Sequence, residues 1–136
     1  MNEFHLTVVT PDGTKFDGMA ASLLVKTENG DVEILAKHVD YFASLGIGRA
    51  RIDANGEKRI ASSAGGFLSV KQNEVMLVAT TFEFADEIDV QRAILAKENA
   101  EEAIARSNDD KMLLLAKAKL ARAINRINVS ELTKTR

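Results

Sequence analysis

The octet DEIDVQRA, residues 86–93, carries residue types that could hold a nucleotide. If a helix begins within the octet, its N-terminus offers free backbone N–H groups to an anion. Arg92 can grip a phosphate through the planar fork of its guanidinium group. Ile88 could cover the face of a base, while Asp89 or Glu83 could accept a hydrogen bond from an exocyclic amine of that base. The octet is therefore a candidate nucleotide site.

A second interpretation of the octet is structural. Asp89 can cap the helix that follows, and acidic residues near a helix N-terminus complement the helix dipole. Arg92, at the third helical position, could pair back to Asp89 or Glu87. The nucleotide interpretation draws on two further residues: Arg122 and Arg126, one turn apart further along the chain, could converge with Arg92 if the two segments fold back antiparallel. Both interpretations stay open on the residues alone, because neither GxxxxGK[ST] nor GxGxxG occurs in the chain.

The chain offers little for catalysis or for metal binding. His5 and His38 are its two histidines, and each stands alone in the sequence, where a structural or exposed role is expected. No His-Glu-Xaa-Xaa-His, GxSxG or close Ser/His/Asp arrangement occurs. The acidic residues Asp86, Glu87 and Asp89 lack the spacing of an EF-hand. We therefore expect no catalytic site, no metal site and no enzyme.

The first 85 residues have the pattern of a β-sheet protein. All six Phe, the single Tyr and all eight Gly lie before residue 85. Short alternations of apolar and polar residues are separated by turn signals such as Asn29-Gly30 and Asn55-Gly56. The predicted strands are residues 4–9, 22–26, 32–35, 47–52, 58–62, 67–70 and 75–82. Residues 1–85 are thus predicted to form an antiparallel β-sandwich, with a barrel as the alternative.

From Asp86 the period changes to that of helices. The first helix has alanines at intervals of three and four, which lie on one helix face: Ala93, Ala96, Ala100 and Ala103. SNDD, residues 107–110, is predicted to be a loop with an N-cap. The second helix is predicted from about Lys111 to Ile127 with an inner stripe of Leu113, Ala116, Leu120, Ala123 and Ile127.

Residues 86–136 should therefore form an antiparallel helical hairpin. Alanines on its facing stripes allow close approach of the helices but bury little apolar area. We expect the hairpin to be weakly held and able to open.

Charges are segregated between the two predicted helices. Residues 86–110 hold eight acids against three bases. Residues 111–130 hold no acid and five bases, namely Lys111, Lys117, Lys119, Arg122 and Arg126. When folded together the helices are complementary, although exposed ion pairs contribute only about 0–1 kcal/mol each. When separated, the second helix would present a basic stripe to an acidic partner; a merely solvated face is the alternative.

Composition excludes several classes of protein. A formal net charge of −2 over 136 residues argues against a general nucleic-acid binder. No apolar run approaches the roughly 20 residues that span a bilayer. The absence of Cys excludes a disulfide framework and fits a reducing, cytoplasmic compartment.

Five segments together resemble the epsilon subunit of F-type ATP synthases. They are VVTPDG (8–13), ENGDVEIL…H (28–38), SAGGFLSV (63–70), EIDVQRA (87–93) and LARAINRINV (120–129). The resemblance implies a β-sandwich (1–85) that binds the rotor stalk, followed by a two-helix regulatory domain (86–136). It further implies a non-catalytic central-stalk subunit that couples proton or sodium translocation to ATP synthesis. Such a subunit is a peripheral membrane protein on the cytoplasmic face of the bacterial cell membrane.

The resemblance also implies partners and a regulatory ligand. The partners are the gamma subunit, the ring of c subunits and the catalytic alpha/beta head, with no nucleic acid. The helical domain switches between a compact hairpin and an extended form that inhibits ATP hydrolysis. ATP favours the compact form in members that bind it, and no other cofactor is required.

The family's site residues transfer to matching positions here. For ATP these are Ile88, Asp89, Arg92 and Ala93 in the motif, Arg122 and Arg126 at the phosphates, and Glu83 beside the adenine. The basic stripe that resembles the segment meeting the acidic loop of beta comprises Lys111, Lys117, Lys119 and Arg122. Asp31 and His38 match positions in a loop expected near the c ring and gamma.

The chain departs from the family in two places. Glu33, Ala36, Lys37 and Asp40 stand where the family has Gly, Pro, Gly and Pro. Asn99 stands where some ATP-binding relatives carry a base. The alternative function is thus a structural stalk subunit whose nucleotide site is vestigial; an unrelated nucleotide-binding adaptor is a third hypothesis.

Overall fold

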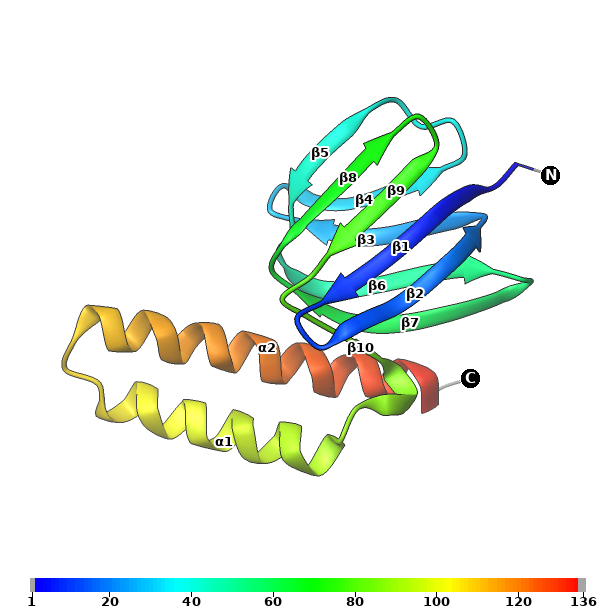
Figure 1. The fold of residues 1–136 in the computed structure, drawn as a ribbon. Coiled ribbons are helices and arrows are strands. Elements are labelled where there is room, and N and C mark those ends of the chain that lie inside the picture. Colours follow the sequence, from blue (N-terminus) through cyan, green and yellow to red (C-terminus); the bar gives the residue numbers. More distant parts are fainter. Residues whose placement is uncertain (1, 135–136) are drawn as a thin grey trace. The chain divides into compact units, whose positions relative to one another are not determined.

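The chain divides after Phe84 into two compact units. This computed structural model describes residues 2–134. The first unit consists of strands and the second of helices, as Figure 1 shows. The predicted fold class, a β-sandwich followed by a helical hairpin, is confirmed.

The first unit is a sandwich of two five-stranded sheets (Figure 1). Sheet A has the order β2 (Gly13–Ala20), β1 (Phe4–Thr10), β9 (Glu74–Val78), β8 (Phe67–Lys71) and β5 (Tyr41–Ser44). Sheet B has the order β10 (Thr81–Phe84), β7 (Glu57–Ala64), β6 (Ile47–Ala54), β3 (Ser22–Thr27) and β4 (Gly30–Leu35). Neighbouring strands are antiparallel except β1 and β9, which are parallel.

The core lies between the sheets and is built from large side chains. On β1 the alternation places Phe4, Leu6 and Val8 inside with no exposed surface. Other fully buried side chains come from both sheets and include Leu23, Ile34, Ile52, Leu68, Leu77 and Phe82. Burying a Leu or Phe contributes about 1.5–3 kcal/mol. The core therefore makes the sandwich a stable platform.

The segment 75–82, predicted as a single strand, changes sheets in the middle. β9 ends at Val78 in sheet A, and β10 begins at Thr81 in sheet B. The reverse crossing, from β7 to β8, uses Gly65 and Gly66 at φ +71° and +94°. A Cβ on Gly66 would overlap the carbonyl oxygen of Val78. The two segments that change sheets thus pack backbone against backbone. Only glycine leaves room for this contact, which explains the glycine pair of the SAGGFLSV segment.

Two strands, β2 and β5, were not predicted. β2 ends sheet A on one side and β5 ends it on the other. The residues of β2 are mostly exposed or half-buried, and β5 has only four residues. Because edge strands need little apolar surface, their sequences show weak alternation.

The helical unit begins with a single 3-10 turn, η1 (Ala85–Glu87), followed by α1 (Val90–Arg106) and α2 (Asp110–Lys134). The predicted loop is confirmed, and within it Asp109 Oδ1 accepts a hydrogen bond from the backbone N–H of Lys111 at 3.0 Å. α2 runs past the predicted end at Ile127, since no Gly or Pro follows to stop it.

Alanines occupy the buried positions where the two helices meet. Ala93 and Ala100 on α1 and Ala116 and Ala123 on α2 are buried. The predicted inner stripe of α2 is confirmed, with its larger side chains half-buried: Leu113, Leu120 and Ile127. On α1 the position predicted at Ala103 is wrong. That residue is exposed and Ile104 is half-buried instead, because three turns from Ala93 cover about 11 residues.

Candidate functional site

The start of α1 holds most of the predicted nucleotide residues. The prediction that Asp89 caps the helix is confirmed: its Oδ1 accepts a hydrogen bond from the backbone N–H of Arg92 at 3.1 Å. The side chain of Arg92 is exposed and makes no ion pair within residues 2–134, so the expected pairing with Asp89 or Glu87 is absent. Ile88 is buried. An exposed guanidinium beside a capped helix start can receive an anion.

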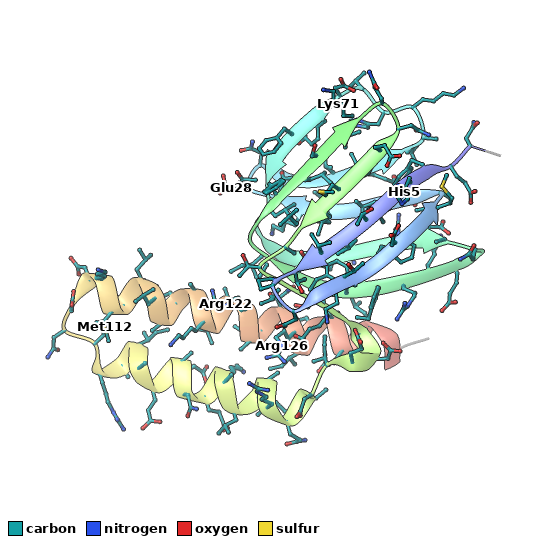
Figure 2. The ribbon with its side chains drawn as sticks, viewed as in Figure 1. His5, Glu28, Lys71, Met112, Arg122 and Arg126 are labelled. Atoms are coloured by element: carbon teal, nitrogen blue, oxygen red, sulfur yellow. The ribbon has the colours of Figure 1, made fainter. Side chains whose placement is uncertain are left out.

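Arg122 and Arg126 belong to the same end of the hairpin. Ala93 and Ala123 stand equally far from Asn108 in the loop, as do Ala100 and Ala116, and all four are buried where the helices meet. In an antiparallel pair this symmetry sets Arg122 and Arg126 level with the first turn of α1. Figure 2 labels Met112 close to the loop and both arginines further along α2.

The side chains of these arginines are half-buried. Because they are one turn apart, Arg122 and Arg126 project from one side of α2. Ala93 lies in the helix interface, where a larger side chain would separate the helices. Together with Arg92, the hairpin end therefore has three guanidinium groups on two helices.

Glu83 differs from the other predicted ligand residues in its location. It lies in β10, in the sandwich unit, half-buried and paired in the sheet with Ser62. The remaining six lie in the helical unit. The part of Glu83 in nucleotide binding stays a prediction.

The lysines predicted to contact a partner are fully available. Lys111, Lys117 and Lys119 are exposed on α2, and none forms an ion pair in the described part of the chain. By contrast, Arg106 on α1 forms an ion pair with Glu102 on the same helix. These three lysines are thus free to meet an acidic surface.

Asp31 and His38 are not neighbours, and Asp31 is not in a loop as expected. Asp31 is the second residue of β4, paired with Lys26, whereas His38 follows the end of that strand. Because a strand rises about 3.3 Å per residue, the stretch from Asp31 to Leu35 alone covers about 13 Å. The two residues therefore belong to different ends of the sandwich.

The loop after β4 is fastened to the turn between β8 and β9. The backbone N–H of Lys37 donates to Asn73 Oδ1 at 2.8 Å, and that of Gln72 donates to Asp40 Oδ1 at 3.2 Å. Lys37 adopts φ +63°, a left-handed conformation that suits Gly. The Gly that the resemblance implies at this position would adopt this conformation without strain. Val39, at the tip, is 74% exposed.

An exposed apolar row on the outer face of sheet A was missed from the sequence. Phe42 on β5 is 67% exposed and stacks on Phe67 with ring centroids 5.3 Å apart. The row comprises Phe42, Phe67 and Met76; strand register places Phe42 on β5 and Met76 on β9 on either side of Ser69 on β8. Phe42 is visible in the sequence as an aromatic residue. That it lies on the outer face of the sheet could be predicted only if residues 41–44 were recognised as a strand.

Two classes of site receive no support in the described residues. Nowhere in residues 2–134 do three His, Cys, Asp or Glu side chains gather as a metal site would need. Over the same residues, neither helix combines the length and the apolar composition that crossing a membrane requires.

Comparison with known families matches both units. Residues 3–85 match the beta-sandwich domain of the ATP synthase delta/epsilon chain, and residues 86–131 match its long alpha-helix domain. An ATP synthase epsilon chain of Bacillus velezensis is 36% identical over 96% of this chain and 98% of its own length. That of Pediococcus pentosaceus is 38% identical over 93% and 94%. The chain belongs to the family of ATP synthase epsilon chains.

Solved structures share the fold. A chain in the Euglena gracilis mitochondrial ATP synthase OSCP/F1/c-ring structure has a TM-score of 0.80 at 20% identity, covering 98% of this chain and 82% of that one. A chain in the central stalk/c-ring structure of the Tetrahymena thermophila enzyme has a TM-score of 0.68 at 18% identity, covering 93% and 95%.

Proposed function

We propose that this epsilon chain is a non-catalytic rotor subunit of the central stalk whose helical hairpin senses ATP. In this role it couples proton or sodium translocation through the c ring to ATP synthesis. The hairpin inhibits ATP hydrolysis when it extends and binds ATP when it is compact. One observation carries the sensing role: Arg92, Arg122 and Arg126 come from two helices at one end of an interface made of alanines.

Energies of the expected size make such a switch workable. A hydrogen bond to a charged group contributes about 1.5–3 kcal/mol. Two such bonds that exist only in the compact form therefore contribute about 3–6 kcal/mol. Moving a two-state population from 1:99 to 99:1 requires about 5.5 kcal/mol. ATP bridging Arg92 on α1 with Arg122 and Arg126 on α2 could thus hold the hairpin closed.

The other surfaces suit the partners of a stalk subunit. We assign the basic side chains of α2, Lys111, Lys117, Lys119 and Arg122, to the acidic loop of the beta subunit in the extended form. The loop around His38, together with Asp31, is assigned to gamma and the c ring. The exposed apolar row of sheet A is a further surface for gamma. The subunit would be held peripherally at the cytoplasmic face of the bacterial membrane through these contacts.

Isothermal titration calorimetry of the full chain with ATP tests the sensing role. We expect saturable binding that Arg92→Ala or Arg126→Ala reduces at least tenfold, the loss of about 1.4 kcal/mol or more. Arg106→Ala is the matched control, because Arg106 is also exposed on α1 but lies beside the loop. Absence of binding at millimolar ATP would exclude sensing.

A substitution at Asn99 distinguishes a subunit that senses ATP from one whose nucleotide site is vestigial. Its side chain is exposed on α1. If the site works weakly for want of a base there, Asn99→Lys will tighten ATP binding through one added charged contact, and Asn108→Lys in the loop will not. If neither variant binds ATP, the subunit couples the rotor without sensing nucleotide.

Truncation after Ala85 tests the inhibitory role separately. The assembled catalytic head with the truncated subunit should hydrolyse ATP faster than the head with the full chain. Equal rates would show that the helices are no inhibitor, whatever the calorimetry gives.

A further inference from the structure

His5 lies between two carboxylates on the outer face of sheet A. Its Nε2 is 2.6 Å from Asp17 Oδ1, and its Nδ1 is 2.7 Å from Glu74 Oε2. Asp17 belongs to β2 and Glu74 to β9, the two strands that flank β1. Figure 2 labels His5 on this face of the sandwich. A single imidazole thus connects three adjacent strands.

Both contacts can be hydrogen bonds at once only if the ring is charged. An ionised carboxylate accepts hydrogen bonds and donates none, whereas a neutral imidazole has one N–H group. The imidazolium has two N–H groups, one for Asp17 and one for Glu74. Loss of its second proton therefore leaves one carboxylate without a donor.

The surrounding charges favour the protonated ring. The hydrogen bond with Asp17, followed by that with Glu74, raises the pKa of His5 above its ordinary value of 6.5. Three further charged residues lie near this group. Lys71 on β8 pairs in register with Glu74, Lys15 lies two residues before Asp17 on β2, and Glu3 lies two residues before His5, just ahead of β1. The side chain of His5 is 38% exposed, so solvent protons reach it directly.

We propose that Asp17, His5 and Glu74 form a proton-dependent clamp that fastens the edge strand β2 to β1 and β9. β2 ends sheet A, so β1 is its neighbour within the sheet. Their pairing is irregular between Val8 and Val9, close to the clamp. Through Asp17, a charged His5 adds a side-chain connection in the last regularly paired stretch before this irregularity.

The direction of the pH effect follows from the charge state. Below the ordinary histidine pKa the ring is charged in both the folded and the unfolded chain, and the clamp is fully closed. As the pH rises through the raised folded-state pKa, the clamp opens and its contribution to stability is lost. β2 should therefore be better protected in mild acid than in mild alkali.

An NMR titration of the full chain in a His38→Gln background tests the proposal, since His5 is then the one histidine that remains. We expect a midpoint above 6.5. The midpoint should fall in Asp17→Asn, and fall less in Glu74→Gln. Asp12→Asn, which removes an acid from the turn before β2, should leave it unchanged. A midpoint at or below 6.5, or one that Asp17→Asn does not lower, would overturn the clamp.

Amide hydrogen exchange of β2 at about pH 5.5 and about pH 8.5, corrected for intrinsic rates, reads out the strand itself. In the unmodified chain protection of β2 should be lower at the higher pH. In His5→Gln it should be the same at both. An equal pH dependence in the two proteins would show that His5 titrates without holding the strand.

Discussion

The sandwich and the hairpin bury side chains of very different size. The sandwich buries Phe4, Leu6 and Phe82 almost completely, whereas the buried positions of the hairpin interface are occupied by alanines such as Ala93 and Ala123. A buried methylene contributes about 0.8 kcal/mol, and a whole Leu or Phe about 1.5–3 kcal/mol. One polypeptide thus combines a unit held by large buried side chains with a helix pair whose buried positions are small.

Large apolar side chains are not missing from the helices, but several of them face outward. Leu95, Leu114 and Leu115 are 57%, 70% and 53% exposed. Their apolar surface does not hold the hairpin closed and is available to a partner. The sandwich and the hairpin therefore differ in the direction that their large apolar side chains face as well as in the number of such side chains.

The largest expected effect is that of Gly66→Ala. The new Cβ would meet the carbonyl group of Val78 at the crossing between sheets. We expect a loss of more than about 4 kcal/mol in the free energy of unfolding, measured by urea denaturation. Gly56→Ala is the matched control, because Gly56 also has positive φ (+75°) but nothing within 4 Å of its Cβ position. Equal losses would show that φ alone matters.

Phe82→Ala should cost the sandwich about 3–5 kcal/mol, because it leaves a cavity in the core. Phe42→Ala removes the same side chain from an exposed position and should change the free energy of unfolding by less than about 0.5 kcal/mol. Urea denaturation followed by circular dichroism measures both. A large loss for Phe42→Ala would place that residue in the core rather than on a contact surface.

Ala123→Leu should open the hairpin while the sandwich stays folded. Overpacking a close interface costs about 1–3 kcal/mol, which is a large share of what alanine contacts supply. Since the chain has no Cys, the pair Glu101→Cys and Lys117→Cys can carry dyes for distance measurement by energy transfer.

The dye separation should increase in Ala123→Leu. The exposed Ala103→Leu is the control and should leave it unchanged. If both variants stay closed, the interface tolerates larger side chains and the hairpin is held by something other than close alanine packing.

Asp89→Ala should weaken the beginning of α1 by about 1 kcal/mol, the usual worth of an N-cap. Amide exchange at Arg92 should accelerate, because its N–H loses the Asp89 acceptor. Asp86→Ala, which removes a nearby acid that caps no helix, should have a smaller effect. Faster exchange throughout α1 would mean that the cap stabilises the whole helix.

The smallest effect is expected for Lys37→Gly, which should stabilise the sandwich by about 0.5 kcal/mol. Relief of the left-handed backbone is worth about 1–2 kcal/mol, and the greater freedom of Gly in the unfolded chain offsets about half or more of it. Lys71→Gly, in β8, is the control and should destabilise. A loss for Lys37→Gly would mean that the lysine side chain supports the loop.

Much of the fold could be predicted because local signals agreed with the final structure. Alternation on β1 and the Asn-Gly turns located most strands, and the change of period at residue 86 located the helices. The break within 75–82 could not be seen, since Leu77 and Phe82 both face the core but from different sheets. Periodicity reports which residues are buried and does not report the sheet to which they belong.

The two candidate sites differed in how far the sequence could reveal them. The arginines of the hairpin could be grouped because a short loop forces the helices to be antiparallel. The His5 cluster depended on β2, which was not predicted, and on a contact between residues 69 positions apart. Such a pairing is set by the sheet order and leaves no local trace.

If the helices move as proposed, the link between the two units would act as a mechanical tether. β10 is an edge strand of four residues, anchored by the buried side chains of Phe82 and Phe84, and Arg59 stacks 3.6 Å from the centre of the Phe84 ring. The next segment, η1, is a single turn whose Ile88 N–H reaches Ala85 O at a long 3.4 Å. If a moving helix pulled on this link, η1 would unfold before β10 left its sheet. The link would then lengthen while the sandwich keeps its structure.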